Sequence, residues 1–358
     1  MNPVERYLAV YYDGKRHQLD KVPSHVQYIT EGFIAKNRKT ILDNYTASLF
    51  NSDYFDIPLA LGFDSIFVPF PPSLKIRPIK VQDENGKLVK IGQDGQNIKR
   101  ITSYYEGGFI NTIEILDDLY ANLELLDNSE LIRKTINRYE KMSSLIFPVL
   151  MVDGIFDRVW KSMGMKTFSR NFQKKTRLYQ ELIKFYAKLT QINIEGLIRA
   201  TGSRGKVINI LDDVAFKGRS MISPLRWEQD FLPYYKELTK IISDNSLIPQ
   251  VHTDGDVTEM IPSFQKAGFL GLQGWEGGAN PIFISEKFPD FVVIGFGDVS
   301  HILPFGTKSQ VKEHVKELMI AFKENRHFII GPSTVIFKEI PLENVIAFMN
   351  AVGKYGKY

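Results

Sequence analysis

Short apolar runs alternate along the chain with stretches in which apolar residues recur every three or four positions. Helical spacing of this kind is clear in Arg177–Leu197 and in Gln310–Lys323. The apolar runs are typical of buried strands, and we predict eight of them: Val26–Ile29, Ser65–Phe70, Ile146–Val152, Val207–Leu211, Ile248–Val251, Phe269–Gln273, Phe291–Gly295 and Phe328–Ile330. Eight strand–helix units favour a (β/α)8 TIM barrel over an open doubly wound sheet. We therefore expect one α/β domain over residues 1–358.

One segment, Lys75–Thr102, interrupts this alternation after the second predicted strand. It contains three short extended runs separated by Glu84–Lys87 and Gln93–Gln96, which carry an Asn-Gly and an Asp-Gly pair. Both pairs favour tight hairpin turns because their residues tolerate positive φ. The segment predicts a β-hairpin insert that covers the barrel mouth, and the alternative is a decoration that faces solvent.

Composition excludes several classes of protein. A net charge of +4, from 45 basic and 41 acidic residues, is too balanced for nucleic acid or an anionic membrane to be the main partner. The chain has no cysteine, which excludes disulfides, thiolate metal sites and cysteine nucleophiles. No apolar run approaches the roughly 20 residues of a membrane span. The first ten residues, MNPVERYLAV, do not resemble a signal peptide, so we expect a cytoplasmic protein.

Polar residues that can carry chemistry follow most of the predicted strands. A barrel brings the carboxyl ends of its strands together at one mouth, where such enzymes hold their active sites. Loops between elements are polar in any case, so part of this recurrence of polar residues after strands is expected by chance. The residues that we expect at this mouth are Asp153, Asp212, Asp213, His252, Asp254, Asp256, Trp275, Glu276, Asp298, His301, Ser333 and Thr334.

The stretch Ile248–Asp256, IPQVHTDGD, is the most informative of these strand ends. An apolar run leads directly into His252, Asp254 and Asp256. Asp256 is also a candidate N-cap of a helix over Val257–Ala267, with Glu259 three residues later completing a capping pattern. A lone histidine here is more often a hydrogen-bonded core residue than a ligand, so both interpretations stay open at this stage.

Two kinds of chemistry fit a histidine among carboxylates. The group can bind zinc or another divalent ion through nitrogen and oxygen atoms, or it can do general acid–base work with raised carboxyl pKa values. Tyr105 and Trp275 are candidates for an aromatic wall, or for ordinary packing. The sequence contains no HExxH motif, serine elbow or Walker loop that indicates another reaction.

At these same residues the chain resembles the uroporphyrinogen decarboxylase superfamily, which includes corrinoid-dependent methyltransferases. The matching stretches follow in order along nearly the whole chain. The most specific stretch is LDDVAFKGRSMISPLRWEQDFLPYYKEL, and VHTDGD, DVSHILPFGTKSQVKEHV and IPLENVIAFMNAVGKYG come after it. The opening NPVERYLAVYYDGKRHQLDKVP and the insert VQDENGKLVKIGQDGQNIKR are similar to the family's first helix and hairpin.

The chain departs from two patterns of this superfamily. True decarboxylases carry an Arg-Gln-Ala-Gly-Arg segment after the first strand, where this chain has TEGFIAKNR, which argues against porphyrinogen decarboxylation. Zinc methyltransferases of the superfamily use a His-x-Cys pair and a later cysteine. Here His252 matches the histidine, Asp254 stands at the first cysteine, and Ser333 or Thr334 lies near the second. A metal site would therefore need oxygen and nitrogen ligands.

The resemblance implies a methyltransferase that moves a methyl group between a small O-, N- or S-methyl compound and a corrinoid protein. In this hypothesis Asp213, His252 and Asp298 are catalytic, and Tyr105, Trp275, His301 and Thr334 contact substrate. His252, Asp254 and Glu276 would bind a metal, with zinc as the candidate ion. The alternatives are a metal-free decarboxylase or lyase that uses Lys217 or Arg219 for a carboxylate, and a non-catalytic ligand-binding barrel. A corrinoid protein and a small substrate are the expected partners, and a homodimer is compatible with the sequence.

Overall fold

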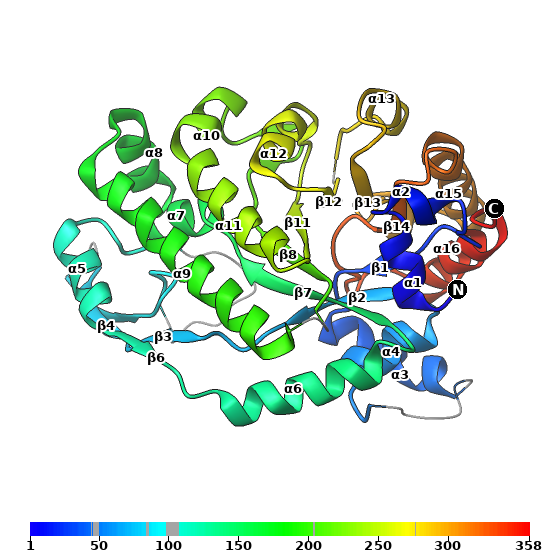
Figure 1. Cartoon of the computed structure of the whole chain (residues 1–358), viewed down its shortest axis with the longest axis horizontal. Helices are drawn as coiled ribbons and strands as arrows, with labels where there is room; N and C mark the ends of the chain where they lie inside the picture. Colours follow the sequence, from blue (N-terminus) through cyan, green and yellow to red (C-terminus); the bar gives the residue numbers. More distant parts are fainter. Residues whose placement is uncertain (44, 46–49, 84–85, 98–106, 203–204, 276) are drawn as a thin grey trace.

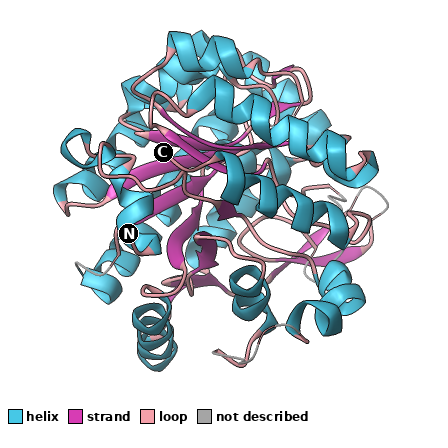
Figure 2. Cartoon of the chain, turned by 90° about the vertical axis from the view of Figure 1, so that its right-hand side faces the viewer, coloured by secondary structure: helices cyan, strands magenta, loops and turns pink. Residues whose placement is uncertain are grey.

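Eight parallel strands form the centre of the computed structural model, and helices surround them (Figure 1, Figure 2). The structure describes residues 1–358 except 44, 46–49, 84–85, 98–106, 203–204 and 276. The barrel strands, in sheet order, are β1 His25–Val26, β2 Ser65–Pro69, β7 Phe147–Asp153, β8 Val207–Leu211, β11 Ile248–Thr253, β12 Gly271–Gly274, β13 Val292–Gly297 and β14 Phe328–Pro332. Seven of the eight predicted strands are confirmed with shifts of at most two residues at their ends, and the first, predicted over Val26–Ile29, is shorter and lies at His25–Val26.

Two helices precede the first strand, and the other helices lie between the strands or after the last one. The helices are α1 Pro3–Ala9, α2 Asp13–Arg16, α3 Glu31–Leu42, α4 Asp53–Ala60, α5 Ile113–Ala121, α6 Ser129–Met142, α7 Phe156–Met163, α8 Met165–Lys174, α9 Arg177–Thr201, α10 Pro224–Asp230, α11 Leu232–Asp244, α12 Ile261–Ala267, α13 Pro281–Lys287, α14 Ile302–Phe305, α15 Lys308–Phe322 and α16 Leu342–Tyr355. In the part of the chain that the structure describes, no helix combines the length and the apolar character needed to cross a membrane.

The strand register closes the barrel. β14 lies beside β1, where the Ile330 amide donates to the Pro23 carbonyl at 2.9 Å and Ser24 pairs in parallel with Ile330. When the register is followed from Asp153 once around the barrel, it returns to β7 at Leu145, eight residues earlier. This stagger is the one that a (β/α)8 barrel requires. The predicted fold class is thus confirmed.

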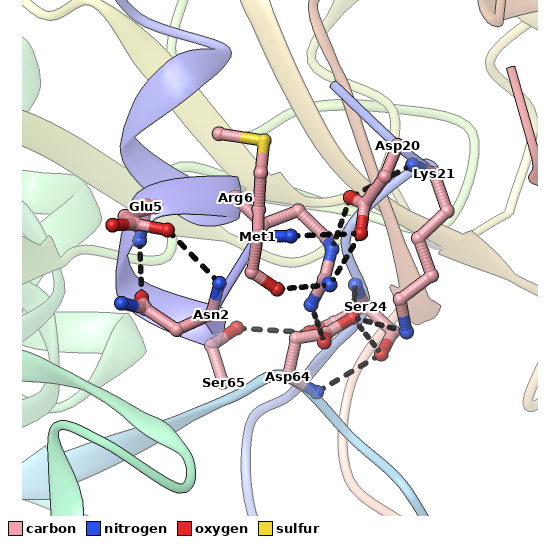
Figure 3. Close-up of polar contacts among 9 residues, drawn as sticks. All are labelled: Met1, Asn2, Glu5, Arg6, Asp20, Lys21, Ser24, Asp64 and Ser65. Atoms are coloured by element: carbon pink, nitrogen blue, oxygen red, sulfur yellow. Dashed lines mark hydrogen bonds and ion pairs between the residues drawn. The ribbon is translucent and has the colours of Figure 1, made fainter. Parts of the chain in front are cut away.

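The N-terminal helix α1 packs against the barrel interior. Its Tyr7 is fully buried, lies 4.7 Å from the ring of Phe147, and donates a hydrogen bond to Gln250 at 2.9 Å. Arg6 of the same helix ties it to the strand starts. Its guanidinium bonds to Asp20 at 2.8 Å and to Asp64 at 2.5 Å, and Lys21 pairs with Asp64 at 3.1 Å (Figure 3).

Two local predictions need correction. We predicted one helix over Val257–Ala267, but a 3-10 turn at Thr258–Met260 precedes α12, which begins at Ile261. Pro262 has no amide hydrogen and suits the first turn of a new α-helix. Asp256 does cap this region, because its carboxylate accepts from the amide and the hydroxyl of Thr258 at 3.0 and 2.7 Å. Glu259 completes no capping box, since α12 has no side-chain cap.

The segment after β2 forms two separate strand pairs in its described residues. β4 Ile79–Gln82 pairs antiparallel with β5 Leu88–Ile91, which are the two runs on either side of Glu84–Lys87. β3 Leu74–Ile76, which overlaps the start of the first predicted run, is not part of this strand pair and pairs antiparallel with β6 Leu123–Leu125. The hairpin as a cover of the barrel mouth stays a prediction, and residues 98–102 of the predicted insert lie outside the described residues.

Candidate metal-binding site at the barrel mouth

Three side chains from two neighbouring strand ends converge at the barrel mouth. Leu211 and His252 are register partners on β8 and β11. Since side chains alternate along an extended chain, Asp213 and Asp254, two residues further on, point to the same side. His252 Nε2 lies 3.7 Å from Asp213 Oδ1 and 3.7 Å from Asp254 Oδ1. One ligand atom from each of the three residues lies within 4.8 Å of the others.

Backbone contacts fix the two loops that carry these acids. The Asp254 amide donates to the Asp213 carboxylate at 3.1 Å, and the Asp212 amide donates to the His252 carbonyl at 2.9 Å. The Val214 amide donates to the Thr253 hydroxyl at 3.0 Å. The positions of the carboxylates are thus set by hydrogen bonds between the loops as well as by the strands.

Gln273 on β12 orients the imidazole of His252. The Gln273 side-chain amide donates to the Ser333 carbonyl at 3.1 Å, which turns its oxygen toward His252 Nδ1. Nδ1 then carries a proton, and Nε2 faces the two carboxylates. His252 itself is buried, with 5% of its side chain exposed, while about one third of each aspartate side chain is exposed (34% and 33%). Two carboxylates converging on Nε2 at this spacing are stabilised when a proton or a metal cation lies among them.

The donor set is chemically suited to a divalent ion. Neutral imidazole and carboxylate oxygen are ordinary ligands of zinc and of several other divalent metals. A hydrogen bond that fixes the other ring nitrogen of a histidine ligand is the usual support of such a site. Asp213, His252 and Asp254 can therefore hold a metal ion, and three protein ligands would leave a coordination position open.

Further acids from α7 and β8 lie beside these three residues. Burial, together with the charge of Asp213, raises the pKa of Asp157 to about 8, and burial raises the pKa of Asp212 to about 6. Lys161 pairs with Asp157 at 2.6 Å and reaches Asp213 at 4.0 Å. Although burial alone would lower the pKa of Lys161, the attraction of Asp157 raises it. Several acids thus lie close together here, and the Lys161 ammonium group contacts two of them, Asp157 and Asp213.

The other predicted site residues have different surroundings. The Asp298 carboxylate accepts hydrogen bonds from the backbone amides of Ser300 and His301 at 2.7 and 2.8 Å. These bonds lie in the turn that precedes α14. His301 is exposed, and Thr334 donates to Gln27 at 3.1 Å. These residues are absent from the group around His252, and their functional roles stay predictions.

Trp275 has the contacts of a core side chain. It is 3% exposed, its ring stacks on Phe296 at 5.1 Å, and its indole N–H donates to the Leu272 carbonyl at 3.1 Å. Gly274 and Trp275 both have positive φ, which breaks the strand alternation at this point. The packing alternative therefore describes Trp275 better than the aromatic wall. Tyr105 and Glu276, the other predicted wall and ligand residues, lie outside the described residues.

Sequence reasoning missed three residues of this site. Gln273 belongs to a predicted strand, but its strand position alone does not show which side chain it meets. Asp157 and Lys161 are spaced four apart on α7 and look like an ordinary surface ion pair of a helix. Their position directly after β7, the third strand of the barrel, was the available signal.

Comparisons with known proteins agree with this architecture. The chain belongs to the uroporphyrinogen decarboxylase (URO-D) family, whose model matches residues 158–355. A methyltransferase from Methanosarcina mazei is similar in structure, with a TM-score of 0.63 and 18% identity, over 99% of this chain and 99% of that chain. A xylose isomerase domain protein from Alicyclobacillus acidocaldarius gives a TM-score of 0.38 and 10% identity, over 93% and 97% of the two chains. The comparison with curated proteins gave no match.

Proposed function

We propose that this protein is a methyltransferase that moves a methyl group between a small O-, N- or S-methyl compound and a corrinoid protein. Family membership and the full-length likeness to a methyltransferase support the reaction class. The observation that carries the proposal is the convergence of His252 Nε2 with the carboxylates of Asp213 and Asp254 at the mouth. The corrinoid, held by its own protein, would accept or supply the methyl group.

The residues that would hold a metal are Asp213, His252 and Asp254. Zinc is the first ion to test. When bound, such an ion supplies a Lewis acid that stabilises negative charge on the heteroatom from which the methyl group leaves. Gln273 keeps His252 Nδ1 protonated and its Nε2 directed at the carboxylates. Asp213 lies beside His252, so we add it to the proposed ligand set, and Glu276, which lies outside the described residues, stays a predicted ligand. His301 and Thr334 are retained as proposed substrate contacts.

The mouth also offers a place for a proton. Asp157 carries a pKa of about 8, so a large fraction of its carboxyl groups is protonated at neutral pH. Lys161 stabilises the carboxylate that remains when this proton leaves. A neighbouring heteroatom that loses a methyl group gains basicity, and a proton held nearby would neutralise it.

Metal content gives the first test of the proposed site. The parent protein should bind close to one zinc ion after zinc addition, measured by elemental analysis, and His252→Ala should lose it. Asp256→Asn is the matched control, because Asp256 lies two residues from Asp254 yet caps Thr258. Binding should weaken at low pH because the ligands must be deprotonated. Unchanged zinc in His252→Ala, or none in the parent, would refute the metal site.

Methyl transfer gives the second test. Reduced cob(I)alamin can stand in for the corrinoid protein, and its absorbance falls as it accepts a methyl group from a panel of methoxy, methylamine and methylthio compounds. The zinc-loaded parent should consume it with at least one compound, and His252→Ala should not. Release of carbon dioxide from carboxylated compounds, without loss of cob(I)alamin absorbance, would instead support the decarboxylase alternative.

A further inference from the structure

Arg158 is a buried guanidinium at the edge of the barrel mouth. It lies on α7, directly after β7, and only 7% of its side chain is exposed. Its guanidinium stacks over the ring of Tyr186 at 4.5 Å. One nitrogen, Nη2, pairs with Asp94 at 3.3 Å, and this aspartate is half exposed (51%).

The hydrogen-bonding capacity of Arg158 is largely unused. Its Nε and Nη1 are buried and have no hydrogen-bond partner in the structure. In the described part of the chain, Asp94 is the one carboxylate within ion-pair distance of this guanidinium. A buried N–H group without an acceptor is unfavourable, and more so when it belongs to a charged group. The arrangement therefore calls for an acceptor that the described residues of the chain do not supply.

Arg158 lies on the same side of the molecule as the candidate metal ligands. Asp153, whose charge acts on Arg158, is the register partner of Leu211, and Leu211 is the register partner of His252. Two strand spacings, about 10 Å, separate the backbones of Asp153 and His252. A small molecule with its methylated atom near His252 can thus extend toward β7 and α7.

We propose that Arg158 binds a carboxylate of the substrate, so that the protein acts on a methylated compound bearing a carboxylic acid. This inference rests on the proposed function and names the substrate class. An arginine guanidinium forms charge-assisted hydrogen bonds with a carboxylate, and the Tyr186 ring beneath it fixes the plane in which the unpartnered Nε and Nη1 can donate. Asp94 and Asp153 place negative charge nearby, which favours a singly charged carboxylate over a phosphate dianion.

Pairs of small compounds that differ only in the acid group test this proposal. Suitable pairs are methoxyacetate with methoxyethanol, dimethylglycine with dimethylethanolamine, and methylthiopropionate with methylthiopropanol. Isothermal titration of the metal-free protein reads binding without requiring activity. In at least one pair the acid should bind about tenfold more tightly than the alcohol, or better. Arg158→Gln should remove this preference and leave the affinity for the alcohol unchanged.

Two further variants complete the test. Asp94→Asn removes the carboxylate that pairs with Arg158. The acidic compound of each pair should therefore bind this variant at least as tightly as it binds the parent. Should Arg158→Gln fail to fold, Arg158→Lys keeps the charge but loses the planar fork, and the preference should fall. No preference for the acid in any pair, or a preference that survives loss of the guanidinium, would overturn the proposal.

The outcome is separable from that of the proposed function. Methyl transfer from neutral compounds alone would leave the methyltransferase standing and overturn the role of Arg158. Acid binding that depends on Arg158, in a protein that transfers no methyl group, would support the anion site and refute the reaction.

Discussion

At the N-terminal end of the barrel, Asp20 and Asp64 are surrounded by donors, whereas at the C-terminal end Asp213 and Asp254 converge on Nε2 of His252. Arg6 bridges Asp20 and Asp64, and hydrogen bonding to Arg6 is the main reason that the pKa of Asp20 lies well below its usual range. At the mouth, the pKa of Asp157 is raised instead. Aspartate carboxylates are thus paired with cationic side chains at the N-terminal end of the barrel, and they lie close to other acids at the C-terminal end.

This difference separates two uses of buried charge. The paired carboxylates of Figure 3 fasten the first helix to the strand starts, and they need nothing from outside the chain. The crowded carboxylates of the mouth have Lys161 4.0 Å from Asp213, and a proton or a further cation among them would stabilise the group. Strongly shifted carboxyl pKa values that gather at a barrel mouth are a usual mark of a functional site.

The largest effect that we expect is the loss of Arg6. Arg6→Ala would leave Asp64, whose side chain is 6% exposed, with less compensation in a buried setting. The free energy of unfolding, measured in urea, should fall by about 3 kcal/mol. Arg38→Ala removes an exposed pair with Asp53, which solvent screens, and should cost much less stability than Arg6→Ala. Equal losses in the two variants would show that the N-terminal cluster is an ordinary surface network.

The support of His252 gives the second effect. Gln273→Ala removes the hydrogen bond that directs Nε2 at the carboxylates, so zinc affinity should fall about 10- to 100-fold. Gln191→Ala, on the outer helix α9, is the control and should leave zinc affinity unchanged. Zinc affinity that is equal in Gln273→Ala and in the parent would mean that the imidazole needs no orientation by Gln273.

The raised pKa of Asp157 predicts a dependence of stability on pH. Its folded pKa of about 8 exceeds the unfolded value of 3.8, so the folded state binds the extra proton between these values. The stability of the parent therefore falls as pH rises through this window, by at most about 1.4 kcal/mol per pH unit from this group. Asp157→Asn should lose that slope and become relatively more stable up to about pH 8. Asp244→Asn, at an exposed helical pair, should keep the parent's slope.

The smallest expected effect concerns Asp256, which the sequence pattern could assign either to the site around His252 or to a helix N-cap. Asp256→Ala removes two hydrogen bonds to Thr258 and should lower the free energy of unfolding by about 1 kcal/mol. Zinc affinity should not change, because Asp256 is not part of the group around His252. A loss of zinc binding in this variant would move Asp256 from the capping role into the site.

The fold was predictable because buried parallel strands are short continuous apolar runs, and each of the eight stands out between polar loops. The strand ends then follow, so His252, Asp213 and Asp254 could be placed at one mouth. Which of the acids there meet His252 depends on register and loop contacts, such as the Asp254 amide on Asp213. Those contacts are formed between segments far apart in sequence, and no local pattern encodes them.

Trp275 and Arg158 both show that local sequence patterns do not reveal the tertiary surroundings of a side chain. Trp275 follows a strand like a mouth residue, yet positive φ at Gly274 and Trp275 breaks the alternation, and its ring packs on Phe296. Arg158 looks like one of many surface arginines in a helix, yet α9 and the segment around Asp94 bury it. Burial of a polar group by distant segments is a property of the tertiary structure.

The measurement closest to the central claim compares thermal unfolding of the parent and Asp213→Asn, each with and without added zinc. Without zinc, Asp213→Asn should unfold at a temperature equal to or above that of the parent, because one crowded carboxylate is gone. Added zinc should raise the unfolding temperature of the parent through binding to the folded state and leave Asp213→Asn nearly unchanged. A variant that is much less stable without zinc, or a parent that zinc does not stabilise, would contradict a mouth built to hold a cation.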